Sequence, residues 1–208
     1  MSVLTDLVVV NRACARVGLE PFQSLNEDLP GGESAQYVYD GVVEFLLGLH
    51  PWSFARETRQ LSRLHGVTPY TGYNHVFQLP PDRLGPPERV TQSARLVDDV
   101  FTDYALQGDY LHADPSELYA LVSVRPEPQR WPTAFLEAAT LAVAAELIMA
   151  IAANSGKRND LRRDVYGSPS EQMRGGVIGV AIRADSIATP PKKLRYAGNP
   201  LTAHYRGG

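Results

Sequence analysis

The sequence has one cysteine in 208 residues, and charge of neither sign dominates it. A single thiol, Cys14, excludes an intramolecular disulfide framework and a multi-cysteine metal site, so cytosolic assembly is the simplest inference. Twenty basic residues against 23 acidic ones give a net charge of −3. No global field would therefore draw the protein to nucleic acid or anionic lipid, and a nucleic-acid binder would need a local patch.

The sequence also shows no pattern typical of a targeting segment or of a membrane-spanning segment. The N-terminus has no basic region and soon reaches an acidic residue at Asp6, so we expect no signal peptide. The longest apolar run, residues 138–153, is interrupted by Glu146 and is half alanine. This run falls short of the ~20 strongly apolar residues that a span needs, so we expect no membrane protein.

The usual motifs of nucleotide binding and catalysis are absent. There is no Gly-x-x-x-x-Gly-Lys-Ser/Thr loop, no Gly-x-Ser-x-Gly elbow, and no His-Glu-x-x-His or His-x-His spacing among the five histidines. The glycine-rich segment 175–179 follows a charged helix instead of opening one, and we interpret it as a flexible joint. We predict no catalytic constellation, no metal site and no cofactor.

Four stretches place apolar residues at the spacing of a helix. Thr5 can cap the first and Gly18 can end it, while Pro51 stops the second. The third is apolar on nearly all sides, so it must be covered either within the chain or by other subunits. The predicted helices are 5–18, 33–50, 132–154 and 158–167.

Residues 56–125 change to short alternating stretches separated by Pro, Gly and Asp, which is typical of strands. Gly108-Asp109 fits a hairpin turn. Between Asp82 and Glu117 eight acidic residues stand against three basic ones. The expected strands are 58–64, 75–79, 89–97, 103–107, 110–113 and 118–124. The fold class is therefore α+β: a bundle of about three to four helices with a small antiparallel sheet inserted between the second and third long helices.

Two large aromatic residues, Trp52 and Phe54, follow the second predicted helix. We expect them to pack back over its last turn as structural core residues. A base-stacking platform is the alternative, but the basic residues that such platforms interleave are missing here.

The last 33 residues, 176–208, hold five basic residues and one acidic residue, together with three prolines. The sequence predicts an extended basic arm of charge about +4, separate from a body of residues 1–175. Its scattered apolar residues cannot form a core alone, so the arm should order against a partner. The densest basic and aromatic cluster, a candidate for binding that partner, is Lys192, Lys193, Leu194, Arg195 and Tyr196.

Three segments, and the long alanine-rich helix preceded by Trp131, Pro132 and Phe135, together resemble the tail tubular protein A family of phage head-to-tail adaptors over residues 4–165. The helix and turn of residues 10–21 match in Gly18, Glu20 and Pro21. The most specific segment matches in Tyr39, Leu47, His50, Pro51, Trp52, Phe54 and Ala55. A third matches in Tyr73, Phe77, Leu79, Pro80 and Asp82. Many relatives finish with a long regular helix, whereas this chain breaks at residues 167–169.

The resemblance implies a structural protein of the virion neck or tail, assembled in the bacterial host cytoplasm, with no enzyme activity. Copies, commonly twelve, would form a ring beneath the portal protein and above a tail or nozzle protein. Double-stranded DNA would pass through without sequence-specific contact. An acidic channel surface would repel DNA phosphates. The candidates for lining the channel are Asp98, Asp99, Asp103 and Asp109. The resemblance also implies that the basic and aromatic cluster at residues 192–196 is the candidate for binding the portal protein or a neighbouring subunit.

Two other functions stay open at this point. The chain could be a DNA-binding module that acts through its basic arm. It could also be a hydrolase if histidines on neighbouring strands converge with a carboxylate. The residues of such a site would be His65, His75, His112 and Asp114.

Overall fold

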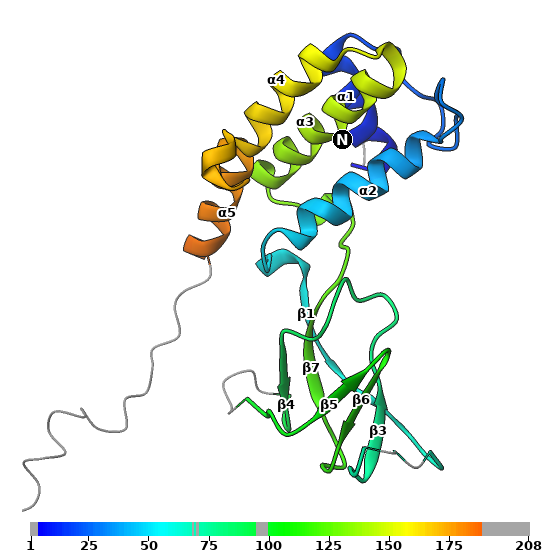
Figure 1. Cartoon of the computed structure of the whole chain (residues 1–208), viewed down its shortest axis with the longest axis vertical. Helices are drawn as coiled ribbons and strands as arrows, with labels where there is room; N and C mark the ends of the chain where they lie inside the picture. The colour runs from blue at the N-terminus through cyan, green and yellow to red at the C-terminus, as the bar shows by residue number, and fades with distance from the viewer. Residues whose placement is uncertain (1–3, 68, 70, 95–99, 189–208) are drawn as a thin grey trace, which may run out of the picture.

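The computed structural model describes residues 4–67, 69, 71–94 and 100–188. Within them the chain is elongated, with five α-helices at one end and seven short strands at the other (Figure 1). We call residues 4–55 and 126–188 the helical body and residues 56–125 the β body. The α+β class that the sequence predicts is confirmed, with the strands inserted between α2 and α3.

Local signals set the ends of the helices. The side chains of Thr5, Ser34 and Asn154 each accept a hydrogen bond from a backbone N–H in the first turn of α1, α2 and α4. Gly18 and Ala153 end α1 and α3 in the left-handed conformation. The helices are α1 (Asp6–Val17), α2 (Ala35–Gly48), α3 (Thr133–Ala152), α4 (Ser155–Tyr166) and α5 (Gly176–Ala188), with short 3₁₀ turns η1 (Ser53–Ala55), η2 (Pro128–Arg130) and η3 (Pro169–Glu171).

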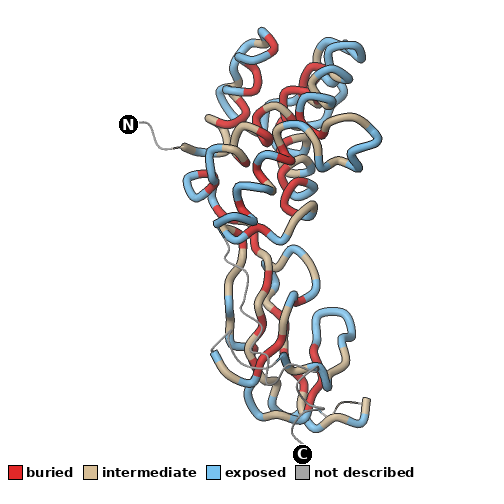
Figure 2. Tube along the Cα trace, turned by 90° about the vertical axis from the view of Figure 1, so that its left-hand side faces the viewer, coloured by how far each residue is buried: buried red, intermediate tan, exposed pale blue. Residues whose placement is uncertain are grey.

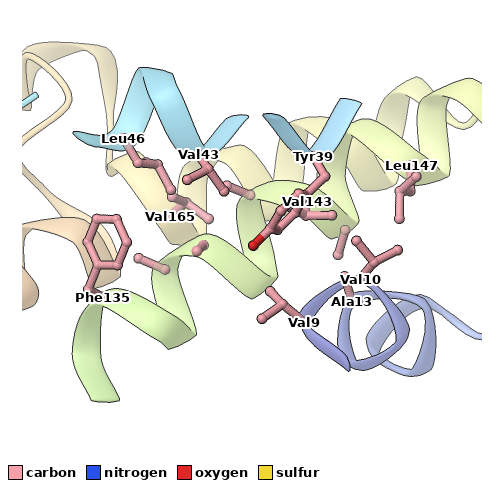
Figure 3. Close-up of a cluster of buried hydrophobic side chains, with 14 of the residues drawn as sticks. Val9, Val10, Ala13, Tyr39, Val43, Leu46, Phe135, Val143, Leu147 and Val165 are labelled. Atoms are coloured by element: carbon pink, nitrogen blue, oxygen red, sulfur yellow. The ribbon is translucent and has the colours of Figure 1, made fainter. Parts of the chain in front are cut away.

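Helix α3 lies at the centre of the helical body and contacts α1, α2, α4 and α5. Phe135, Val143 and Leu147 of α3 are buried, and Figure 3 shows them among side chains from α1, α2 and α4. The chain itself therefore covers much of the helix that the sequence predicts to be apolar on nearly all sides.

Helix α5 corrects the prediction of an extended arm from residue 176. Its first residue is Gly176, so the glycine-rich segment opens a helix and is not the flexible joint that the sequence suggested. A Cβ atom on Gly176 would clash with the backbone carbonyl oxygens of Asp164 and Val165. The glycine therefore allows α5 to start directly against the end of α4, and the resulting burial of Ile178 and Ala181 stabilises the helix.

The strands form two antiparallel sheets where the sequence predicts one. The first has the order β1-β7-β4 and the second the order β2-β3-β6-β5. The strands are β1 (Arg56–Gln60), β2 (Ser62–Leu64), β3 (His75–Gln78), β4 (Arg89–Thr91), β5 (Ala105–Gln107), β6 (Tyr110–Ala113) and β7 (Tyr119–Ser123).

Two details explain how the sheets differ from the prediction. The single strand predicted for residues 58–64 is split at Leu61, which is buried and donates its N–H to the Leu118 carbonyl at 2.8 Å. The strand predicted for residues 89–97 ends at Thr91, and positions 95–97 lie outside the described residues. The hairpin at Gly108-Asp109 is confirmed, because it joins β5 to β6.

Two core clusters lie along the long axis of the molecule, one in each body. Buried segments run through the middle of the helical body and along the strands below it (Figure 2). The two bodies are joined where the chain enters β1 and leaves β7. Here the Val124 N–H donates to the Ala55 carbonyl at 2.8 Å.

Trp52 closes the bottom of the helical core next to this junction. Its side chain is 1% exposed, and its indole N–H donates to the Leu46 carbonyl at 2.9 Å. The ring lies 4.9 Å from the Phe135 ring in an edge-to-face arrangement and 5.6 Å from the half-buried Phe54 ring. Trp52 and Phe54 are thus placed in the core, at the end of α2.

We predict that Trp52→Ala lowers the free energy of unfolding by about 3–5 kcal/mol, because it removes a fully buried aromatic ring and leaves a cavity. Urea denaturation followed by circular dichroism would measure the change. Tyr37→Ala is the control, since Tyr37 is 74% exposed, and its effect should stay within about 0.5 kcal/mol. Equal stability of Trp52→Ala and the native protein would contradict the assignment.

Candidate functional site

Two of the four residues considered for a hydrolase site, His112 and Asp114, have separate partners. His112 is 7% exposed, and its Nδ1 lies 2.7 Å from the Thr71 hydroxyl oxygen. Asp114 accepts hydrogen bonds from the backbone and side-chain amides of Asn74, both at 2.9 Å. Across the described ranges, no three His, Cys, Asp or Glu residues come together as metal ligands. The structure therefore gives the hydrolase alternative no assembled metal site in the part of the chain that it describes.

Cys14 lies on the buried side of α1. Its side chain is 0% exposed, and burial raises the pKa of the thiol. A buried thiol with a raised pKa is a poor nucleophile. Cys14 therefore acts as a packing residue.

The acidic residues of the β body are largely paired, a feature that sequence reasoning missed. Arg83 contacts Asp109 at 2.8 Å, and Tyr73 donates to Asp103 at 3.1 Å. The other two channel candidates, Asp98 and Asp99, lie outside the described residues.

Strand β1 brings two further arginines to this surface. Arg56 contacts Glu88 at 2.8 Å, and Arg59 contacts Asp82 at 2.6 Å. The Arg59 guanidinium, hydrogen-bonded to Asp82, holds the pKa of that carboxyl below its usual value. The local excess of negative charge is thus smaller than the count between positions 82 and 117 implies, because these arginines come from outside that segment.

A buried carboxylate joins α5 to the turn after α2. Asp185, 7% exposed, accepts a hydrogen bond from the Ser53 hydroxyl at 2.6 Å and bonds from the Ser53 backbone N–H at 3.1 Å. The Nε2 atom of His50 lies 3.2 Å from the same carboxylate. We call His50, Ser53 and Asp185 the junction clamp.

The order of contacts decides what the junction clamp can do. In a Ser-His-Asp triad the histidine lies between the other two side chains and takes the serine proton. Here the carboxylate lies in the middle, and the Ser53 hydroxyl donates to Asp185. The arrangement therefore fixes a helix in place and does not activate a nucleophile.

Sequence reasoning missed Asp185 as a functional residue. The only signal was one carboxylate within the otherwise apolar or basic segment 176–188. Because its partners lie 132 and 135 positions earlier in the chain, no local pattern could identify them.

Two more side chains from the resemblance segments hold elements together. Asn11 of α1 accepts from the Phe22 backbone N–H at 2.8 Å and donates to the Phe22 carbonyl at 3.0 Å, which fixes the loop after the helix. Tyr39 of α2 donates to Asp6 at 2.7 Å. Burial, and next the hydrogen bond to Asp6, raise the pKa of Tyr39 well above its usual value, so this hydroxyl stays protonated.

An arginine that follows β7 joins the contact between Tyr39 and Asp6. The Arg125 guanidinium lies 5.3 Å from the centre of the Tyr39 ring and contacts Asp40 at 2.7 Å. Through these contacts α1, α2 and the segment that leaves the β body share one set of polar interactions.

The portal-binding candidates lie beyond the structure described. The cluster of Lys192, Lys193, Leu194, Arg195 and Tyr196 is outside the described residues, which end at Ala188.

Comparison with protein-family models and with curated proteins finds no match for this sequence. Among the described helices only α3 is long and apolar enough to cross a bilayer, with mean hydropathy 1.9. Of its apolar window, 56% is buried inside the protein, as in the core helix of a bundle.

We predict that Asp185→Asn loosens α5, since an amide cannot accept from Ser53 and His50 as a carboxylate does. The loss should be about 1.5–3 kcal/mol, the range for hydrogen bonds to a charged group. Hydrogen–deuterium exchange should accelerate in α5 more than in α1.

The matched control for this variant is Asp160→Asn on the exposed surface of α4. It should leave exchange in α5 unchanged. Unchanged exchange in the Asp185→Asn protein would show that the junction clamp does not hold the helix.

Proposed function

We propose that this protein is a structural head-to-tail adaptor of a phage or phage-like particle. Copies form a ring, commonly of twelve in the family it resembles, beneath the portal protein and above a tail or nozzle protein. The ring continues the channel for double-stranded DNA, contacts that DNA without reading its sequence, and has no enzymatic role. Its location is the virion neck or tail, after assembly in the bacterial host cytoplasm.

The observation that carries the proposal is the place of residues 50–55, which form the end of the most specific resemblance segment. Trp52 closes the helical core, Ser53 binds α5, and Ala55 is hydrogen-bonded to the segment leaving β7. The first two contacts hold the helical body together, and the third ties it to the end of the β body. An adaptor that meets one protein above and another below depends on such a fixed geometry, whereas an enzyme motif would gather reactive groups.

The remaining residues of the resemblance segments support the same interpretation. Asn11 and Tyr39 are tied by hydrogen bonds between elements, and Phe77 and Leu79 are buried in the β core. Each of these residues maintains the architecture. This is the use of sequence motifs expected in a structural protein.

The exposed carboxylates of the β body fit the lining of a DNA channel only in part. Asp103 and Asp109 lie on exposed parts of the β body, but Asp109 is paired with Arg83. A pair of opposite charges exerts little net repulsion on DNA at physiological salt. The described partner of Asp103 is the Tyr73 hydroxyl, which carries no opposite charge. We therefore assign both residues to a surface that does not attract DNA, with weaker repulsion at Asp109 than at Asp103.

We predict that the purified protein is monomeric or weakly associated in dilute solution and forms rings when mixed with the portal protein encoded in the same genome. Each chain has its own core clusters and can fold alone. Light scattering would measure the free state, and electron microscopy would image the mixture. Failure to bind the portal, or a stable ring in dilute solution without it, would contradict this prediction.

We also predict that deleting residues 190–208 leaves the melting temperature nearly unchanged but prevents attachment to portal-bearing heads. The segment lies beyond α5, and it carries four basic residues and no acidic one, which suits an acidic groove on a partner. Calorimetry and pull-down of heads would test both parts. Normal attachment of the truncated protein would show that this segment is not an anchor.

Deletion of residues 190–208 also distinguishes the adaptor function from the DNA-binding alternative. The positive charge of this segment favours that alternative. If the chain acts mainly on DNA, the full protein should bind a duplex with strong salt dependence. Truncation would then abolish that binding, and portal attachment would not depend on the segment.

A further inference from the structure

The outer face of α5 carries apolar side chains that no other described element covers. Ile187 is 83% exposed and Val180 is 49% exposed. Arg183 and Ala184, also exposed, lie between them at helical spacing, so the four share one side of the helix. We call Val180, Arg183, Ala184 and Ile187 the α5 face.

A second uncovered face lies on α2. Tyr37, Gly41, Glu44 and Gly48 follow one another at spacings of four, three and four residues, and all are exposed. Tyr37 is 74% exposed. Phe45, next to this row, is 45% exposed, and its ring packs edge to face with the Tyr166 ring of α4, whose centre lies 6.0 Å away. We call these five residues the α2 face.

Gly41 on the α2 face has no explanation within one chain. A Cβ atom added there would meet no other atom within 4 Å. Glycine in the interior of a helix is less favourable than alanine. A missing side chain between two exposed aromatic residues would, however, let a second helix approach the backbone of α2 closely.

The two faces carry charges of opposite sign. Glu44 stands in the row of the α2 face and Arg183 in the α5 face, and neither forms an ion pair with another described residue. Val180 and Ile187 on one face can fill the space that Gly41 and Gly48 leave on the other, with Tyr37 and Phe45 at its sides. Opposite charges and matching apolar surfaces set the register of such a contact.

We propose that the α5 face of one copy binds the α2 face of a second copy. The contact joins two different surfaces, so each copy can bind a neighbour on either side, and such contacts generate a ring when the rotation closes. In Figure 1 α5 lies at one margin of the helical body, and α2 runs along the other side of α3. The inference deepens the proposed function, on which it rests for the ring itself, by naming the subunit contact.

Disulfide cross-linking of the full-length chain tests the contact directly. The native Cys14 is buried and should not react. The chain carrying both Glu44→Cys and Arg183→Cys, oxidised at high protein concentration, should give dimers, trimers and higher species on a non-reducing denaturing gel. A mixture of the two single variants should stop at dimers.

Each single variant alone is the control and should stay monomeric. Absence of cross-linked species in the double variant would overturn the proposal. Equal dimer formation by one single variant alone would also overturn it, because that result requires a symmetric contact of one face with itself.

A second variant separates blocking of the contact from misfolding. In the cross-linking chain, Gly41→Leu should preserve or raise the melting temperature, because the folded chain has room for the side chain, yet it should reduce the cross-linked fraction at least tenfold. The matched control is Gly156→Leu on α4, where an added Cβ would meet Asn154 Oδ1 at an ordinary 3.6 Å. Equal cross-linking in the two proteins would contradict the role of the α2 face.

The outcomes for the contact and for the proposed function are distinguishable. Rings seen on the portal without cross-linking between positions 44 and 183 would overturn this contact and leave the adaptor function standing. Cross-linked oligomers of a protein that never binds the portal would support the contact and overturn the adaptor function.

Discussion

The helical body depends on one constraint: the apolar surface of a twenty-residue helix with almost no polar side must be covered. Helix α3 could not remain in water with its apolar surface uncovered, because each exposed aliphatic side chain would forgo roughly 1.5–3 kcal/mol of burial. Helices α1, α2, α4 and α5 therefore surround it. The polar contacts of Asn11, Tyr39 and Asp185 then fix how the surrounding elements are placed. Hydrophobic burial drives the helices together, and the hydrogen bonds determine their relative positions.

Much of this architecture could be predicted from the sequence because its signals are local. Thr5 and Gly18 mark the ends of α1, and the glycine-aspartate pair at 108–109 marks a hairpin. Helix α5 was missed because its glycines and the prolines beyond it suggested an irregular chain. Its stability comes from packing on α3 and α4, which is a tertiary effect.

The interactions that define the candidate sites were less accessible to sequence reasoning. Trp52 could be assigned to the core because a large aromatic residue just past a helix end has one obvious place to pack. Its neighbour Ser53 gave no signal, since its partner Asp185 is 132 positions away. The pairing of Arg59 with Asp82 was hidden for the same reason, and it reduced the negative charge that a count along the sequence had suggested.

The hydrogen bond between the Val124 N–H and the Ala55 carbonyl places the two ends of the β body side by side. A segment whose entry and exit are neighbours behaves as an insertion into the fold that carries it. Loops far from these ends can gain, lose or exchange residues without moving the points where the chain returns to the helices. The junction thus allows the loops at the far end of the β body to change while the core of each body stays packed.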